Sequence, residues 1–269
     1  MDTIIRLHKL VYTGSTLSLL LCLTFCSGKT DPPAEEQPPP PPHALPRLIR
    51  TLPHDTTSFT QGLLYENGRL FESTGLYGKS TLQTLDTMGT VTLKRELSAG
   101  IFAEGCAFFA GTVFQITWRE QLCFTYAAAN LTPVDTLSYS GEGWGLTEND
   151  TLFIMSNGSD TLFFRNNRFN LVRRLPVTCG GTPLVEINEL EYARGRIYAN
   201  VWHSDFIFEI NPGNGRVERI YDCSELVARE APPSDEHVLN GIAYNPASDQ
   251  FYLTGKNWKN LFVVTLPRK

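Results

Sequence analysis

Short apolar stretches alternate with polar turns along most of this chain, and the pattern recurs with a regular period. The apolar residues 63–65 are followed by a turn at residues 67–68 and by a second apolar stretch at residues 70–73. That turn is an Asn-Gly pair, which is strongly preferred in two-residue β-hairpins. A third stretch follows at residues 81–85. The pattern predicts antiparallel strands joined by tight turns.

Five segments repeat a small polar motif followed by a strand with an aromatic residue. They read TQGLLYENGRLFESTG, AEGCAFFAGTVFQITW, GWGLTENDTLFIMSN, INELEYARGRIYANVW and LNGIAYNPASDQFYLTGK, and equivalent positions lie 40 to 52 residues apart. Units of this length with about four strands each are typical of β-propeller blades. We therefore expect an all-β fold, a five-bladed β-propeller over residues 46–269. Residues 48–52 should form the outer strand that closes the ring.

Two columns of the repeat carry residues suited to binding. The first contains Gln61, Glu104, Trp144, Asn188 and Asn240, and the second contains Gly75, Trp118, Asn157, Trp202 and Lys256. Equivalent positions of a propeller surround the same end of its central channel, so these side chains should converge. Indoles, one acid, amides and one lysine suit a small polar ligand held between aromatic walls. The alternative is that the tryptophans fill gaps between blades.

The first 45 residues do not carry the repeat. Arg6, His8 and Lys9 precede a largely apolar run at residues 10–25, which ends at Cys26. This layout is typical of a secretory signal peptide, and the closing cysteine favours the lipoprotein type, although Phe25 replaces the usual small residue before it. An ordinary cleaved signal and an uncleaved anchor are the alternatives. We expect residues 1–26 to be the signal peptide and the protein to be exported, either periplasmic or a membrane-tethered lipoprotein.

Residues 27–45 are expected to be a linker, because residues 32–42 read PPAEEQPPPPP. Such a tract forms a polyproline II spacer and cannot build a core. If Cys26 carries lipid, the spacer would hold the propeller away from the membrane.

Composition excludes several kinds of function. The chain has 269 residues, of which 23 are basic and 28 acidic, so it has no basic footprint for nucleic acid. The cysteines after the leader fit neither a zinc knuckle nor a CxxC redox motif. Cys106 and Cys123 lie in strand patterns and are expected to be buried thiols, while disulfide pairing stays open. The nucleophile motif GxSxG and the zinc motif HExxH do not occur.

Several motifs occur in order between residues 59 and 266, namely FTQGL, ESTGLYGKS, EGWGLT, INELEY, ANVW, LNGIAY and TGK. At these motifs the chain resembles the plant-type glutaminyl cyclases, the β-propeller glutaminyl-peptide cyclotransferases that also occur in bacteria. The resemblance implies a five-bladed propeller that converts the N-terminal glutamine of peptides or proteins to pyroglutamate and releases ammonia. It implies no cofactor for catalysis and leaves open a structural calcium ion in the channel. Peptides or proteins with N-terminal Gln would be the partners.

The resemblance also assigns the site. Substrate would be bound by Phe59, Gln61, Phe102, Trp118, Trp144, Glu189 and Trp202. The catalytic residues would be Glu104, Lys256 and Asn188, with no metal ligands. In the reaction, the attacking amine loses a proton and the leaving nitrogen gains one, so one carboxyl group with a raised pKa can serve both steps. Lys256 and Asn188 are placed to stabilise the tetrahedral oxyanion. For Glu189, anchoring a strand end is the alternative role.

Two other classes of function remain open at this point. A non-catalytic propeller could bind peptide N-termini with the same pocket. A metal-dependent propeller lactonase or hydrolase would require several carboxylates and amides around a metal, whereas the inner columns contain mainly one acid among indoles.

Overall fold

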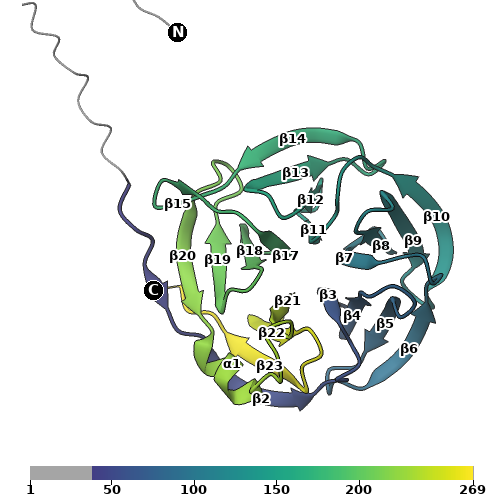
Figure 1. Ribbon diagram of the computed structural model, residues 1–269, viewed down its shortest axis with the longest axis horizontal. Helices are drawn as coiled ribbons and strands as arrows, with labels where there is room; N and C mark the ends of the chain where they lie inside the picture. Colours follow the sequence, from purple (N-terminus) through teal and green to yellow (C-terminus); the bar gives the residue numbers. More distant parts are fainter. Residues whose placement is uncertain (1–37, 269) are drawn as a thin grey trace, which may run out of the picture. The chain divides into compact units, whose positions relative to one another are not determined.

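The computed structural model describes residues 38–268 of the chain, so the expected signal peptide and residues 27–37 of the expected linker lie outside the described part (Figure 1). The described residues form five antiparallel blades around a central axis, which confirms the all-β, five-bladed propeller. Figure 1 shows β3, β7, β11, β17 and β21 nearest to the centre. Within residues 38–268, no helix is both long and apolar enough to cross a membrane.

The first three blades run from the centre to the rim in chain order. The first contains β3 (Thr60–Glu66), β4 (Arg69–Thr74), β5 (Thr81–Leu85) and β6 (Val91–Glu96). The second contains β7 (Ala103–Phe109), β8 (Thr112–Thr117), β9 (Leu122–Ala127) and β10 (Thr132–Ser138). The third contains β11 (Leu146–Glu148), β12 (Phe153–Met155), β13 (Thr161–Arg165) and β14 (Leu171–Pro176). The predicted hairpin turn at Asn67 and Gly68 is confirmed, with φ values of 48° and 80°.

The fourth and fifth blades are completed by strands from the beginning of the described chain. The fourth contains β17 (Ile187–Ala193), β18 (Arg196–Val201), β19 (Phe206–Ile210), β20 (Val217–Asp222) and the parallel strand β1 (His43–Ala44). The fifth contains β21 (Leu239–Asn245), β22 (Gln250–Gly255), β23 (Asn260–Thr265) and β2 (Arg47–Pro53). β2 pairs with β23, so the expected closing strand is confirmed. Because β1 pairs with β20, sheet structure begins at residue 43, before the expected boundary at residue 46.

Three smaller elements lie in the connections on either side of the fourth blade. The hairpin of β15 (Thr178–Cys179) and β16 (Thr182–Pro183) connects the third and fourth blades. The α-helix of the described residues, α1 (Ser224–Glu230), lies between the fourth and fifth blades.

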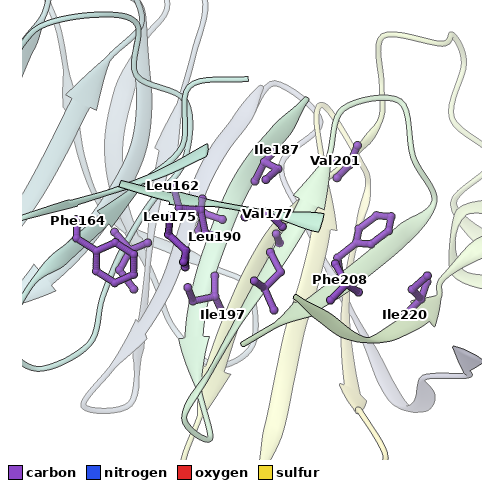
Figure 2. Packing of buried hydrophobic residues seen from close by; sticks show 14 residues of the cluster. Leu162, Phe164, Leu175, Val177, Ile187, Leu190, Ile197, Val201, Phe208 and Ile220 are labelled. Atoms are coloured by element: carbon purple, nitrogen blue, oxygen red, sulfur yellow. The ribbon is translucent and has the colours of Figure 1, made fainter. Parts of the chain in front are cut away.

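The core consists of five apolar clusters, one at each junction between neighbouring blades. Figure 2 shows the cluster between the third and fourth blades, where Phe164 and Leu175 pack near Leu190 and Ile197. Strands inside a blade are covered on both faces, whereas the outer strands are largely exposed. Cys106 and Cys123 belong to two of these clusters and are free thiols, as predicted.

Irregular strand pairing positions the side chains of the first column. The register shifts in four of the innermost strands, at the positions of Gln61, Glu104, Asn188 and Asn240. A β-bulge bends its strand and re-aims the local side chain. In the third blade, β11 begins only after Trp144. The first-column residues are therefore released from the regular sheet pattern at one end of the channel.

The position after each first-column residue is glycine in four blades: Gly62, Gly105, Gly145 and Gly241. A Cβ atom on Gly62 would lie 2.6 Å from the backbone nitrogen of Cys106, and one on Gly145 would collide with the carbonyl oxygen of Asn188. The innermost strands therefore meet backbone to backbone here. In the fourth blade the equivalent residue is Glu189.

Candidate active site

One cavity of about 310 Å³ brings together nine of the ten predicted site residues. It is lined by Phe59, Gln61, Phe102, Glu104, Trp118, Trp144, Asn188, Trp202 and Lys256, together with Leu76 and Glu236. Each blade contributes at least one of the predicted residues, from its innermost strand, from the segment just before that strand or from the residue that follows its second strand. The expected convergence of the two columns is confirmed for seven of these residues, all except Phe59 and Phe102, which belong to neither column.

Glu104 is a buried carboxyl group that lines this cavity. It is 4% exposed, and its Oε2 atom is buried without a hydrogen-bond partner among the described residues. Burial raises the pKa of Glu104 well above its ordinary value of 4.5. Lys256 opposes this shift, whereas Glu142 and Glu120 add to it. A carboxyl group with a raised pKa can act as a general acid or base.

Gln61 lies beside Glu104 and is oriented by Asn240. Asn240 Nδ2 donates to the backbone oxygen of Thr60 at 2.9 Å and to Gln61 Oε1 at 3.3 Å. With its oxygen held in this way, Gln61 presents its amide N–H group to Glu104, and this hydrogen bond lowers the pKa of the carboxyl group. Asn240 belongs to the first column but does not line the cavity.

Lys256 and Asn188 supply further polar groups. Lys256 is 6% exposed, and burial lowers the pKa of its ammonium, although Glu104 and Glu236 oppose that shift. Its Nζ lies 4.8 Å from the centre of the Phe59 ring. Asn188 Oδ1 is buried without a partner in the described structure. A cation and a carboxamide are thus both available to a ligand.

Aromatic rings form most of the remaining wall. The Phe102 and Trp118 ring centres are 5.5 Å apart, and Trp144 and Trp202 meet edge to face at 6.0 Å. In the first blade the second column has a glycine, Gly75, and the Phe102 ring takes up the space beside it. A Cβ atom on Gly75 would lie 2.9 Å from a ring carbon of Phe102. The tryptophans of these columns therefore line the cavity and are not confined to gaps between blades.

Comparison with known proteins identifies the family of the chain. The family model described as "Glutamine cyclotransferase" matches residues 17–266. The chain belongs to this glutamine cyclotransferase family. A glutaminyl-peptide cyclotransferase from Arabidopsis thaliana is 34% identical over 226 residues, which cover 81% of this chain and 70% of the plant protein. The crystal structure of Myxococcus xanthus glutaminyl cyclase has 40% sequence identity and a TM-score of 0.79, covering 83% of this chain and 97% of that one.

Glu189 differs from the other residues predicted for this glutamine cyclotransferase, because it does not line the cavity. Its side chain is fully buried, and its two oxygens accept the backbone N–H groups of Leu63 at 3.1 Å and Ile242 at 2.9 Å. It thus connects the fourth blade to the first and the fifth across the channel. The alternative role, a structural anchor, is the one that the geometry favours over substrate binding.

Two residues that line the cavity of this family member were not predicted from the repeat. Leu76 and Glu236 line the cavity from connections outside the repeated segments, and Leu76 has a φ of 84°, which is unusual for a residue with a side chain. Asn157 belongs to the second column but serves its own turn, because its Oδ1 accepts hydrogen bonds from Ser159. The signal for Leu76 was its position directly after Gly75 in the ESTGLYGKS motif.

Within residues 38–268, no cluster of three or more His, Cys, Asp or Glu side chains is placed to hold a metal. The described residues therefore give no protein ligand set of this kind for the calcium ion that the sequence left open.

Proposed function

We propose that this glutamine cyclotransferase family member converts the N-terminal glutamine of peptides or proteins to pyroglutamate and releases ammonia. The observation that carries the proposal is the buried carboxyl group of Glu104, whose Oε2 atom has no hydrogen-bond partner among the described residues and which shares a cavity with Lys256, Asn188 and three indoles. The cavity volume of about 310 Å³ suits one amino-acid side chain with its backbone better than a long ligand.

The first step forms the lactam carbon–nitrogen bond. The substrate's α-amine attacks its own γ-carboxamide carbon, and the electron pair of the C=O bond moves to oxygen. Ring closure within one bound molecule needs no enzyme nucleophile, since orientation supplies much of the rate. The Glu104 carboxylate takes the proton that the amine loses, and its raised pKa makes it a stronger base than an ordinary carboxylate.

The second step breaks the bond to the leaving nitrogen. Protonated Glu104 returns its proton to that nitrogen, the C=O bond reforms, and ammonia departs. In between, the Lys256 ammonium and the Asn188 side-chain N–H stabilise the oxyanion, for which one well-placed donor contributes about 3 kcal/mol. Asn188 Oδ1 can accept a hydrogen bond from the substrate's nitrogen. Proton transfer and charge stabilisation complete this scheme, so we propose catalysis without a cofactor.

The aromatic side chains would hold the glutamine side chain and keep water out. Phe59, Phe102, Trp118, Trp144 and Trp202 surround the polar groups. Exclusion of water favours attack by the amine over hydrolysis to glutamate. Gln61, with its oxygen held by Asn240, contributes the amide N–H that faces Glu104.

Ammonia release from a short peptide with N-terminal Gln tests this function directly. The purified full chain should release one ammonia for each pyroglutamyl peptide detected by mass spectrometry, with or without a chelator. The same peptide with an acetylated α-amine is the control, because it cannot close the ring. Formation of an N-terminal glutamate peptide, or no ammonia above the uncatalysed rate, would contradict the proposal, and loss of activity in chelator would contradict cofactor-free catalysis.

We also propose that the protein acts outside the cytoplasm, tethered through lipid on Cys26 or free in the periplasm. The support is the apolar run that ends at Cys26 and the proline-rich spacer behind it. Mass spectrometry of the mature N-terminus tests this, and Cys26→Ser should abolish lipid attachment and shift the protein from the membrane fraction to the soluble fraction. A mature chain that retains residues 1–25 would contradict the cleaved forms.

A further inference from the structure

Glu142, two residues before Trp144, connects two indoles of the cavity. Its Oε2 atom accepts the indole N–H group of Trp118 at 2.9 Å and that of Trp144 at 3.4 Å. Trp118 follows β8 of the second blade, whereas Trp144 precedes β11 of the third. One carboxylate oxygen therefore connects two parts of the cavity wall that come from different blades.

Arg119 holds this carboxylate from the solvent side. Its Nε donates to Glu142 Oε1 at 3.1 Å, and its guanidinium lies 3.6 Å from the centre of the Trp118 ring. Partial burial acts to raise the pKa of Glu142, but the hydrogen bonds from Trp118, Arg119 and Trp144 hold it below its usual value. The carboxylate is thus ionised at neutral pH and accepts all three donors.

The backbone beneath Glu142 is fixed as well. The backbone N–H group of Gly143 donates to the carbonyl oxygen of Trp118 at 3.0 Å. The backbone N–H group of Trp144 donates to the carbonyl oxygen of Ser156 at 3.1 Å. A Cβ atom on Gly143 would lie 2.9 Å from the Thr117 carbonyl oxygen, so this segment packs directly against the end of β8. The backbone that carries the Glu142 side chain is therefore held in place.

We propose that Glu142 is a positioning residue: by accepting both indole N–H groups it fixes the tilt and separation of Trp118 and Trp144 around the substrate's glutamine side chain. This role rests on the proposed function, because the two indoles line the cavity assigned to that side chain. A shorter acid at this position would keep the charge but could not reach both indoles. An amide of the same length would keep the reach but lose the charge.

Besides positioning the indoles, Glu142 affects the ionisation of Glu104, because its negative charge raises the pKa of that carboxyl group. The groups that face Glu104 are Lys256, Glu142, Glu120 and Gln61, of which the two outer carboxylates favour its protonated form. Glu120 is a matched control for Glu142, because its Oε1 accepts a hydrogen bond from the Tyr77 hydroxyl at 3.0 Å and not from an indole. Comparing variants of Glu142 and Glu120 therefore separates the effect of indole positioning from the effect of charge on Glu104.

Steady-state kinetics of three variants across pH test the proposal. Glu142→Asp should raise KM for a short Gln peptide about fivefold or more, with a smaller change in kcat and an unchanged acidic limb of the pH profile. Glu142→Gln should leave KM within about twofold of wild type and move the acidic limb to lower pH. Glu120→Gln should move the limb in the same direction without changing KM.

Two results would overturn the positioning role. One is a KM for Glu142→Asp within about twofold of wild type, and the other is an equal rise in KM for Glu142→Asp and Glu142→Gln. Indole fluorescence of the ligand-free proteins provides a readout that does not need turnover, and Glu142→Asp should change the emission spectrum while Glu120→Gln should not. If the wild type fails to cyclise glutamine, the proposed function fails, and this emission comparison still decides the positioning role.

Discussion

Asn240 holds the side chain of Gln61 in one orientation, with its Nδ2 atom 3.3 Å from Gln61 Oε1. The two residues occupy the first column in the fifth and first blades, so their contact spans the junction at which the ring closes. It decides which end of the Gln61 amide faces Glu104. Because an N–H group faces the carboxyl group, the ionised form of Glu104 is favoured.

Gln61→Leu should therefore raise the pKa of Glu104 further. If the Glu104 carboxylate is the base, activity is lost as pH falls through its pKa, so the acidic limb of the kcat/KM profile should move to higher pH. The profile of wild type and variant, measured with one Gln peptide, checks this. A limb that moves to lower pH would contradict the inferred orientation of Gln61.

Lys256→Met should remove the cation next to the developing oxyanion. We expect kcat to fall about 10²- to 10³-fold, as for loss of one oxyanion donor, while the fold is retained. Kinetics and the thermal unfolding midpoint measure the two effects. Lys259→Met is the control, since Lys259 is exposed and does not line the cavity. Equal kcat values for the two variants would rule out this role for Lys256.

Glu189→Ala should destabilise the propeller. The variant leaves the buried N–H groups of Leu63 and Ile242 without their acceptor, at a cost of about 1–3 kcal/mol each. Chemical denaturation measures the loss in the free energy of unfolding, and the exposed Glu186→Ala is the control. A large rise in KM with unchanged stability would instead support the substrate-binding role first expected for Glu189.

The buried pair of His54 and Glu72 should make stability depend on pH. Their side chains are 3.0 Å apart and almost fully buried, where the chain leads from β2 into the first blade. Burial alone would lower the pKa of His54, but Glu72 raises it above 6.5. For Glu72, burial acts to raise the pKa, yet His54 and hydrogen bonds hold it below 4.5.

The sign of the effect follows from these two directions. The His54 contribution is complete below pH 6.5 and is lost as pH rises through the folded-state pKa, whereas the Glu72 contribution is complete above pH 4.5 and is lost as pH falls. The pair should thus stabilise most between these values. His54→Gln should cost about 3–5 kcal/mol and flatten the dependence of the unfolding midpoint on pH above 6.5. A variant with the same pH dependence as wild type would contradict this.

The sequence predicted the blades because the 40- to 52-residue period, the turn residues and the strand patterns all indicate the same architecture. Its two columns placed seven site residues in one cavity, since equivalent positions of a propeller share one end of the channel, and the family resemblance added Phe59 and Phe102. The role of Glu189 could have been recognised from the same repeat. Four blades carry glycine at its position, so its side chain is the one that crosses the channel there.

Contacts made by connecting segments could not be predicted in this way. Glu142 lies in the quoted motif EGWGLT, but its bond to Trp118 depends on how two loops from different blades face each other. Glu236 reaches the cavity from the long connection after α1, which has no counterpart in the other blades. The repeat predicts only features that all blades have in common, whereas Glu142 and Glu236 lie in connections that differ from blade to blade.

The central claim is that the Glu104 carboxyl group moves the proton during lactam formation, and the variant Glu104→Gln tests it most directly. Binding of a Gln peptide measured by calorimetry should stay within a few-fold of wild type, while kcat for ammonia release should fall about 10²- to 10⁴-fold, the usual contribution of a general acid–base group. Binding without turnover in both proteins would instead indicate a non-catalytic peptide receptor. Ammonia release by Glu104→Gln at close to the wild-type kcat would contradict the account.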